Sequence, residues 1–320
     1  MKDALLRYGP DNPDTTYVAH AYAEDLFDTG EVRLNHATAG AAERPALLLV
    51  PGQTESWWGY EEAVGLLAED FEVFAVDLRG QGRSTRTPGR YTLDNMGNDL
   101  VRFISGRIGR PAIVSGLSSG GVLSAWLSAY APPGMIQAAV YEDPPLFSSE
   151  ISPAYGQSIR QGLGPLFHAW STYLGDQWSV GDWAGFLAAA PTVLPPGLAR
   201  FLAAEAPGDE PPQNLKEYDP EWGRAFWTGT AAASCDHKRM LSAVKVPVLL
   251  THHFHRIDEE TGHLQGALSD LQAHQAGELV RAAGQRFDYR SFPEMGHAMH
   301  RIDPKLYATT VRDWLAEVLP

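Results

Sequence analysis

The chain carries Gly-Leu-Ser-Ser-Gly at positions 116–120, between an apolar run at 112–115 and an amphipathic segment at 120–131. This G-x-S-x-G order is typical of a sharp turn that joins a buried strand to a helix. The serine of such a turn adopts a strained backbone, and neighbours larger than glycine would collide with the strand and the helix. The turn exposes the Ser118 hydroxyl at a helix N-terminus, where developing negative charge is stabilised. We predict that Ser118 is a catalytic nucleophile; the alternative is a turn that is only structural.

Strand-like and helix-like segments alternate along most of the chain. The helix-like segments are amphipathic and occupy 61–68, 93–106, 120–131, 268–283 and 304–319. The strand-like runs are short and apolar, as buried parallel strands are, and they occupy 46–50, 71–76, 112–115, 137–141, 248–251 and 286–292. A more polar run at 31–37 predicts a leading antiparallel strand. Together with the serine turn, this alternation predicts an α/β-hydrolase fold with a doubly wound, mostly parallel sheet.

The alternation stops between 146 and 234, where Trp, Ala, Gly and Pro are frequent. We interpret this stretch as a helical cap, or lid, over the carboxyl ends of the strands, where open α/β sheets bind ligands. The core domain then comprises 1–145 and 235–320, and the cap domain comprises 146–234. Aromatic side chains there favour an apolar pocket, to which we assign Trp183 of the cap and Trp58 of the core. The alternative is that these tryptophans only pack the cap on the core.

A serine nucleophile needs a general base. In this fold the base follows the last strand, and Phe-Pro-Glu-Met-Gly-His-Ala-Met-His at 292–300 follows the run at 286–292. His297, preceded by Gly296, is the predicted base, and His300 is the second candidate. The chain order, with the nucleophile first and the histidine last, fits an α/β-hydrolase.

The acid that orients the histidine is less simple to assign. Its usual position, nine residues after the proline of the strand at 246–251, holds Arg256, and Asp258 lies two residues later. The preceding strand ends in Glu142 and Asp143, and a carboxylate at the end of an apolar strand is costly to bury unless it has a partner such as a histidinium. We favour Glu142 over Asp143 and Asp258.

The oxyanion of an acyl transfer needs two backbone N–H groups. One is predicted at Ser119, directly after the nucleophile. The other is predicted at Gln53, in the loop that follows the strand at 46–50, where Pro51-Gly52 stands in place of the His-Gly of many related enzymes.

Three histidines, His252, His253 and His255, cluster where another predicted strand ends. A metal site needs three or four ligands that converge on one point. On an extended strand His253 and His255 would share a face and His252 would point away. We therefore expect neutral, hydrogen-bonded histidines here, no metal and no cofactor.

The amino-acid composition restricts the kinds of molecule that the chain is expected to bind. The 25 Lys and Arg residues against 39 Asp and Glu residues give a formal net charge of −14, which repels nucleic acids and anionic membrane surfaces. No apolar run approaches the roughly 18 residues of a membrane span, and 1–20 has no secretory signal pattern. The single cysteine, Cys235, forms no internal disulfide, which suits a cytoplasmic protein. A small neutral or apolar ester is the expected partner.

Several stretches resemble the zearalenone lactonases, α/β-hydrolases that open the macrocyclic ester of a fungal resorcylic acid lactone. The serine turn at 116–121 and Tyr-Glu-Asp-Pro at 141–144 carry the resemblance, and further stretches similar to the bacterial members lie at 56–60, 91–103, 175–183, 214–226 and 268–273. The separation of 24 between Ser118 and Glu142 matches that family (142 − 118 = 24).

The resemblance implies a Ser118–His297–Glu142 triad, oxyanion amides at Gln53 and Ser119, and substrate contact by Trp222. It also implies a homodimer and a product that loses carbon dioxide unaided. Two alternatives use the same pocket: another carboxylesterase or carbon–carbon hydrolase, and a small-molecule receptor with very slow turnover.

Overall fold

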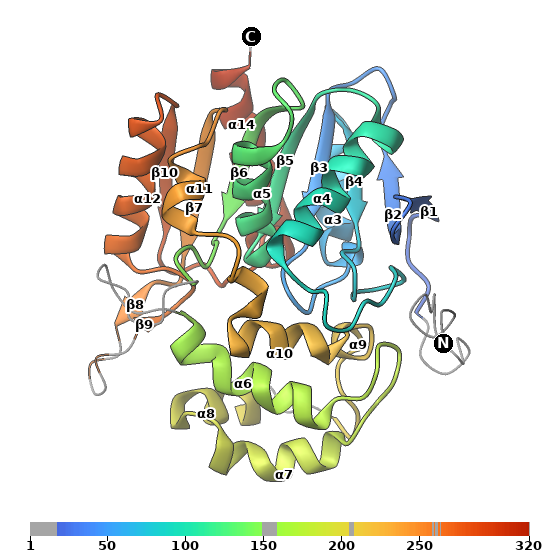
Figure 1. Ribbon diagram of the computed structural model, residues 1–320, viewed down its shortest axis with the longest axis vertical. Helices are drawn as coiled ribbons and strands as arrows, with labels where there is room; N and C mark the ends of the chain where they lie inside the picture. The colour runs from blue at the N-terminus through green and yellow to red at the C-terminus, as the bar shows by residue number, and fades with distance from the viewer. Residues whose placement is uncertain are drawn as a thin grey trace.

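A central eight-stranded sheet organises the computed structural model, which describes residues 18–148, 159–204, 208–257, 259, 262 and 264–319 (Figure 1). The strand order is β1-β2-β4-β3-β5-β6-β7-β10. The strands are β1 (Glu24–Asp28), β2 (Arg33–Ala39), β3 (Ala46–Val50), β4 (Glu72–Val76), β5 (Ala112–Leu117), β6 (Ile136–Glu142), β7 (Val248–His253) and β10 (Phe287–Phe292). Strand β2 is antiparallel to β1 and β4, and the remaining neighbours are parallel. The predicted mostly parallel sheet and leading antiparallel strand are confirmed, and β1 is an addition.

Helices cover both faces of this sheet (Figure 1). One face carries α4 (Leu93–Phe103), α5 (Ser119–Tyr130), α11 (His237–Leu241) and α12 (Asp270–Ala282), and the other carries α3 (Glu61–Leu67), α13 (Met299–Ile302) and α14 (Pro304–Val318). Strand β5 contributes side chains to the apolar core on each face. Ala112 and Val114 lie in the core beneath α4, α5, α11 and α12, and Ile113 lies in the core beneath α3, α13 and α14. This alternation of side chains along one strand is why the buried strands read as continuous apolar runs.

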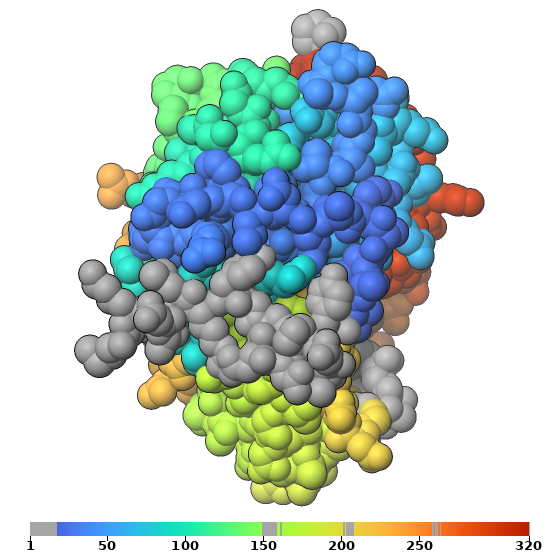
Figure 2. Space-filling model, turned by 90° about the vertical axis from the view of Figure 1, so that its right-hand side faces the viewer, coloured from blue at the N-terminus to red at the C-terminus, as the bar shows by residue number. Residues whose placement is uncertain are grey.

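The described part of 146–234 is helical. Helices α6 (Ile159–Tyr173), α7 (Trp183–Val193), α8 (Pro196–Ala204), α9 (Gln213–Lys216) and α10 (Pro220–Thr228) lie beyond the carboxyl edge of the sheet, and Figure 2 shows the yellow-green surface of this layer as a lobe below the core. Hydrogen bonds join it to the loop after β4, among them Asp219 N–H to the Gly80 carbonyl at 2.8 Å and Trp178 Nε1 to the Gly82 carbonyl at 2.8 Å. The division into a core and a cap domain stays a prediction.

Two short strands form a separate sheet outside the central one. A two-stranded sheet, β8 (Arg256–Ile257) with β9 (Leu264–Gln265), projects between β7 and α12. No helix in the described ranges is long and apolar enough to cross a membrane.

Candidate active site

Ser118 occupies the turn between β5 and α5 with φ +54° and ψ −121°. Positions 116 and 120, two residues to either side, must hold glycine. A Cβ on Gly116 would lie 2.3 Å from the Gly120 carbonyl oxygen, and one on Gly120 would lie 2.2 Å from the Val50 carbonyl oxygen. The Ser118 side chain is half-buried, and its N–H donates to the carbonyl of Glu142 at 2.8 Å. The predicted strained turn is therefore present, and it lies against the end of β6.

His297 follows β10 and contacts the end of β6. Its Nδ1 lies 2.6 Å from Oδ2 of Asp143, whose other oxygen accepts the N–H of His253 at 3.0 Å. The Asp143 side chain is 1% exposed, whereas that of His297 is 44% exposed and open to a substrate. Desolvation lowers the pKa of His297, but the hydrogen bond and the charge of Asp143 raise it above its ordinary 6.5. The ring thus has a buried anionic partner on Nδ1, which leaves Nε2 to act as a base.

His300 lies in a different, fully buried arrangement between two carboxylates. Its Nδ1 lies 2.9 Å from Oε2 of Glu142, its Nε2 lies 3.3 Å from Oε1 of Glu55, and its ring stacks on Tyr60 at 3.7 Å. Burial lowers the pKa of His300, but attraction to Glu142 and Glu55 raises it to about 9. A histidinium with both nitrogens engaged cannot take a proton from Ser118, so His300 is not the base.

The pairing of acid and histidine differs from the expected one. The sequence predicted Glu142 beside His297, but the structure places Glu142 on His300 and Asp143 on His297. Consecutive residues at a strand end point to opposite sides, and Asp143 adds a turn because its φ is +40°. These two effects carry the Asp143 carboxylate toward the loop of His297. The third candidate, Asp258, lies outside the described residues.

The loop after β3 packs directly on the nucleophile. A Cβ on Gly52 would lie 3.3 Å from the Cβ of Ser118, and the Gly52 carbonyl accepts the side-chain amide of Gln81 at 2.7 Å. Gln53 comes next, and its side chain donates to the Tyr218 hydroxyl at 2.6 Å. Ser119 is the first residue of α5. Of the two amides predicted for the oxyanion, that of Gln53 thus lies in the loop after β3, and that of Ser119 lies at the start of α5.

The three tryptophans assigned to the pocket have separate surroundings. Trp58 is partly buried, and its Nε1 donates to Glu217 at 2.9 Å. Trp222 is 2% exposed and stacks near Tyr91, with ring centroids 6.3 Å apart. Trp183 is 3% exposed, stacks on Phe186 of its own helix and donates to the Gly208 carbonyl at 3.0 Å. Trp183 thus packs within the 146–234 segment and Trp222 packs near Tyr91, and substrate contact by these tryptophans stays a prediction.

Glu55, Tyr60 and Tyr218 were missed by the sequence reasoning. Burial raises the pKa of Glu55, but attraction to His300 and hydrogen bonds lower it, with the net shift downward. The Tyr60 hydroxyl accepts the N–H of Leu117 at 3.0 Å and donates to the Val50 carbonyl at 3.2 Å. Tyr60 and Tyr218 lie in stretches that carry the family resemblance, but nothing in the spacing of the three residues relates them to Ser118.

The expectation for the three histidines was wrong in its geometry. Strand β7 ends at His253, and Phe254 adopts φ +37°, so the chain turns back there. His255 consequently stacks on His252, with ring centroids 3.9 Å apart. His253 instead faces the active site, with Nδ1 at 3.0 Å from the His297 carbonyl.

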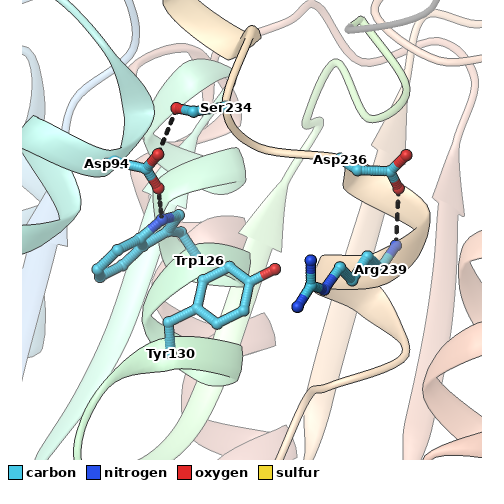
Figure 3. Close-up of a pocket in the computed structure, with 6 residues that line it drawn as sticks. All are labelled: Asp94, Trp126, Tyr130, Ser234, Asp236 and Arg239. Carbon is cyan, nitrogen blue, oxygen red and sulfur yellow. Dashed lines mark hydrogen bonds between the residues drawn. The ribbon is translucent and has the colours of Figure 1, made fainter.

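A separate surface pocket lies between α4, α5 and α11 (Figure 3). Asp94 there accepts the indole N–H of Trp126 at 2.8 Å and the hydroxyl of Ser234, and Asp236 accepts the N–H of Arg239 at 2.8 Å. These bonds engage Asp94 and Asp236, and none of the predicted catalytic residues lines the pocket. We assign it no substrate.

Comparisons with known proteins find a family model, sequence relatives and similar solved structures. The model of the alpha/beta hydrolase family matches residues 47–310. The chain is 29% identical to 3-oxoadipate enol-lactonase 2 of Acinetobacter baylyi over 147 residues, which are 45% of the chain and 54% of that protein. It is 27% identical to epoxide hydrolase 4 of Mus musculus over 159 residues, 48% of the chain and 44% of that protein. The chain thus spans about half the length of the curated relatives it matches.

Solved structures show a similar fold over nearly the whole chain. The enol-lactonase from Burkholderia xenovorans LB400 is 16% identical with a TM-score of 0.61, and the alignment covers 91% of this chain and 100% of that one. A hydrolase from Pseudomonas aeruginosa PA01 is 22% identical with a TM-score of 0.60, covering 92% and 99%. At these identities the likeness concerns the fold alone.

Proposed function

Because the chain belongs to the alpha/beta hydrolase family, we propose that it is a serine hydrolase of carboxylic esters or lactones. The observation that carries the proposal is the strained Ser118 turn, bonded through its N–H to the β6 end whose next residue, Asp143, holds His297. A nucleophile on a strained turn and a histidine with a buried carboxylate on Nδ1 are the parts of a serine triad. We assign the orienting acid to Asp143, although the family resemblance implied Glu142.

The proposed reaction has two steps. The Ser118 hydroxyl attacks the ester carbonyl carbon while Nε2 of His297 takes the hydroxyl proton, and the amides of Gln53 and Ser119 stabilise the oxyanion. His297 then gives that proton to the leaving alkoxide, and an acyl-enzyme forms. A water that loses its proton to His297 hydrolyses this ester, which releases the acid and the serine. The chain supplies the nucleophile, the general base and the oxyanion donors, and the ester carbonyl carbon is the electrophile, so the proposed reaction needs no cofactor.

For the substrate we propose a neutral macrocyclic resorcylic acid lactone of the zearalenone type. Two arguments support it: the resemblance over several stretches of the chain, and the similarity of one half of the chain to an enol-lactonase. The net charge of −14 also favours a neutral over an anionic substrate. By the same resemblance we propose a homodimer, which light scattering tests as twice the mass of the 320-residue chain.

The decisive experiment incubates the pure protein with zearalenone and follows substrate loss against Ser118→Ala. Loss in the wild type alone supports lactone hydrolysis, and equal rates in both proteins refute the substrate. Turnover in a parallel panel of aryl esters and carbon–carbon hydrolase substrates would identify another carboxylesterase or a carbon–carbon hydrolase. Thermal stabilisation by zearalenone without turnover of any compound would indicate a receptor instead.

A further inference from the structure

His252, His255 and Asp270 bring three metal-ligating atoms together where β7 ends and α12 begins. Their ligand atoms all lie within 4.8 Å of one another. Oδ1 of Asp270 is 2.8 Å from Nδ1 of His255 and 3.9 Å from Nδ1 of His252. Atoms bound to one tetrahedral zinc ion at about 2.0–2.1 Å lie about 3.3 Å apart, a spacing that these two distances bracket.

The hydrogen bonds of His252 orient its ring for a ligand role. Its Nε2 lies 2.7 Å from the carbonyl oxygen of Leu268. Because a carbonyl only accepts, Nε2 carries the proton, and in the neutral ring the lone pair is on Nδ1. That lone pair faces the Tyr289 hydroxyl at 2.9 Å on the side of Asp270. Metal-bound histidines commonly donate their other N–H to a carbonyl in this way, which fixes the ring and its tautomer.

His255 provides the second, independent observation. Its Nε2 contacts the Ser291 hydroxyl at 3.1 Å, so that its Nδ1 also points toward Asp270. The 2.8 Å approach to Asp270 lacks the angle of a hydrogen bond, and within the described ranges this buried Nδ1 has no hydrogen-bond partner. Buried polar atoms without a partner are rare and call for an explanation, such as an ion.

We propose that His252, His255 and Asp270 form a binding site for a zinc ion. Two imidazole nitrogens and one carboxylate oxygen are a donor set that zinc accepts and that magnesium, which prefers oxygen, does not. Water or the Tyr289 hydroxyl completes four-coordination. The Asp270 side chain is 76% exposed, which gives the ion a path from solvent.

The ion would join the end of β7 to the start of α12. His253, which lies between His252 and His255 in the chain, donates its N–H to Asp143 at 3.0 Å and contacts the His297 carbonyl through its ring. Zinc at this site therefore braces the segment that holds the proposed acid, and it stabilises the folded chain.

The test is isothermal titration of the untagged, chelator-treated protein with zinc chloride, and a thermal melt with and without the ion. We expect one zinc per chain and a higher melting temperature, with no response to magnesium. His255→Ala and Asp270→Asn each weaken binding more than about tenfold. Asp270 is exposed and His255 is partly buried, and circular dichroism checks that each variant is folded.

His274→Ala is the matched control. His274 lies on the same helix, exposed, with Nε2 at 3.2 Å from Glu278, so it has the ordinary surface affinity of a histidine for zinc. This variant should bind zinc as the wild type does. The proposal fails if the wild type shows no saturable binding, if His255→Ala and Asp270→Asn bind unchanged, or if the control loses the site equally.

Discussion

Replacing Asp143 by asparagine tests the proposed site most directly. The Asp143 carboxylate is 1% exposed and faces two groups: Nδ1 of His297 at 2.6 Å and the N–H of His253 at 3.0 Å. An asparagine has one acceptor and one donor for these positions. If its oxygen still accepts from His253, its NH₂ faces His297 and moves the ring proton to Nε2, where it blocks the proton transfer from Ser118. If the amide turns over, two N–H groups face each other at His253.

We therefore expect Asp143→Asn to lower kcat by about 10⁴, the cost of a wrong tautomer in a serine triad. At 1.36 kcal/mol per tenfold, that loss is about 5.5 kcal/mol of transition-state stabilisation. Asp143 also raises the pKa of His297. Because the base acts deprotonated, the acidic limb of kcat/KM should move to lower pH in the variant.

The assay measures hydrolysis of zearalenone or of the best ester in the panel from pH 5 to 9, with active sites counted by an acylating inhibitor. Glu142→Gln is the matched control at the adjacent position, since it removes a carboxylate from His300 rather than from His297. It should reduce stability more than kcat. A 10⁴-fold loss in Glu142→Gln with kcat retained in Asp143→Asn would refute the assignment and restore Glu142 as the acid.

Three further predictions concern packing, charge and hydrogen bonding around the site. Gly120→Ala places a Cβ 2.2 Å from a β3 carbonyl oxygen and should destabilise the fold by about 1–3 kcal/mol or more in urea unfolding, while Gly162→Ala, in open space on α6, should be neutral or stabilise by up to about 1 kcal/mol. The pKa of His300 is raised to about 9 in the folded chain, so protonation of His300 stabilises the folded state, fully so below about pH 6.5. The free energy of unfolding should therefore fall as the pH rises from 6.5 to 9, and His300→Gln should flatten that slope. Tyr218→Phe removes the 2.6 Å bond to the Gln53 side chain and should lower kcat/KM about 2- to 10-fold, by loosening the oxyanion loop; an unchanged value would show that this bond does not position the loop.

Local patterns in the sequence were sufficient to predict the fold and the strained turn at Ser118. The alternation of apolar and amphipathic runs reflects side-chain periodicity, which is a property of neighbouring residues, and so the parallel sheet could be predicted. The turn at Ser118 could be predicted because its motif is a run of five adjacent residues, although one of its glycines, Gly120, is required by a contact with Val50 of β3. Strand β1 could not, since its half-exposed residues lack the strong pattern of a buried strand.

Which carboxylate pairs with His297 was decided by tertiary structure. Glu142 and Asp143 are adjacent acidic residues after one strand, and no periodicity distinguishes them. The end of the β6 pleat and the positive φ of Asp143 send the two carboxylates to opposite sides, toward His300 and His297. The same holds for His252 and His255, which stack only because Phe254 reverses the chain. The sequence alone determined that a serine on a strained turn would be presented, whereas which charged groups surround it and its neighbouring histidines depended on backbone angles that only the folded chain imposes.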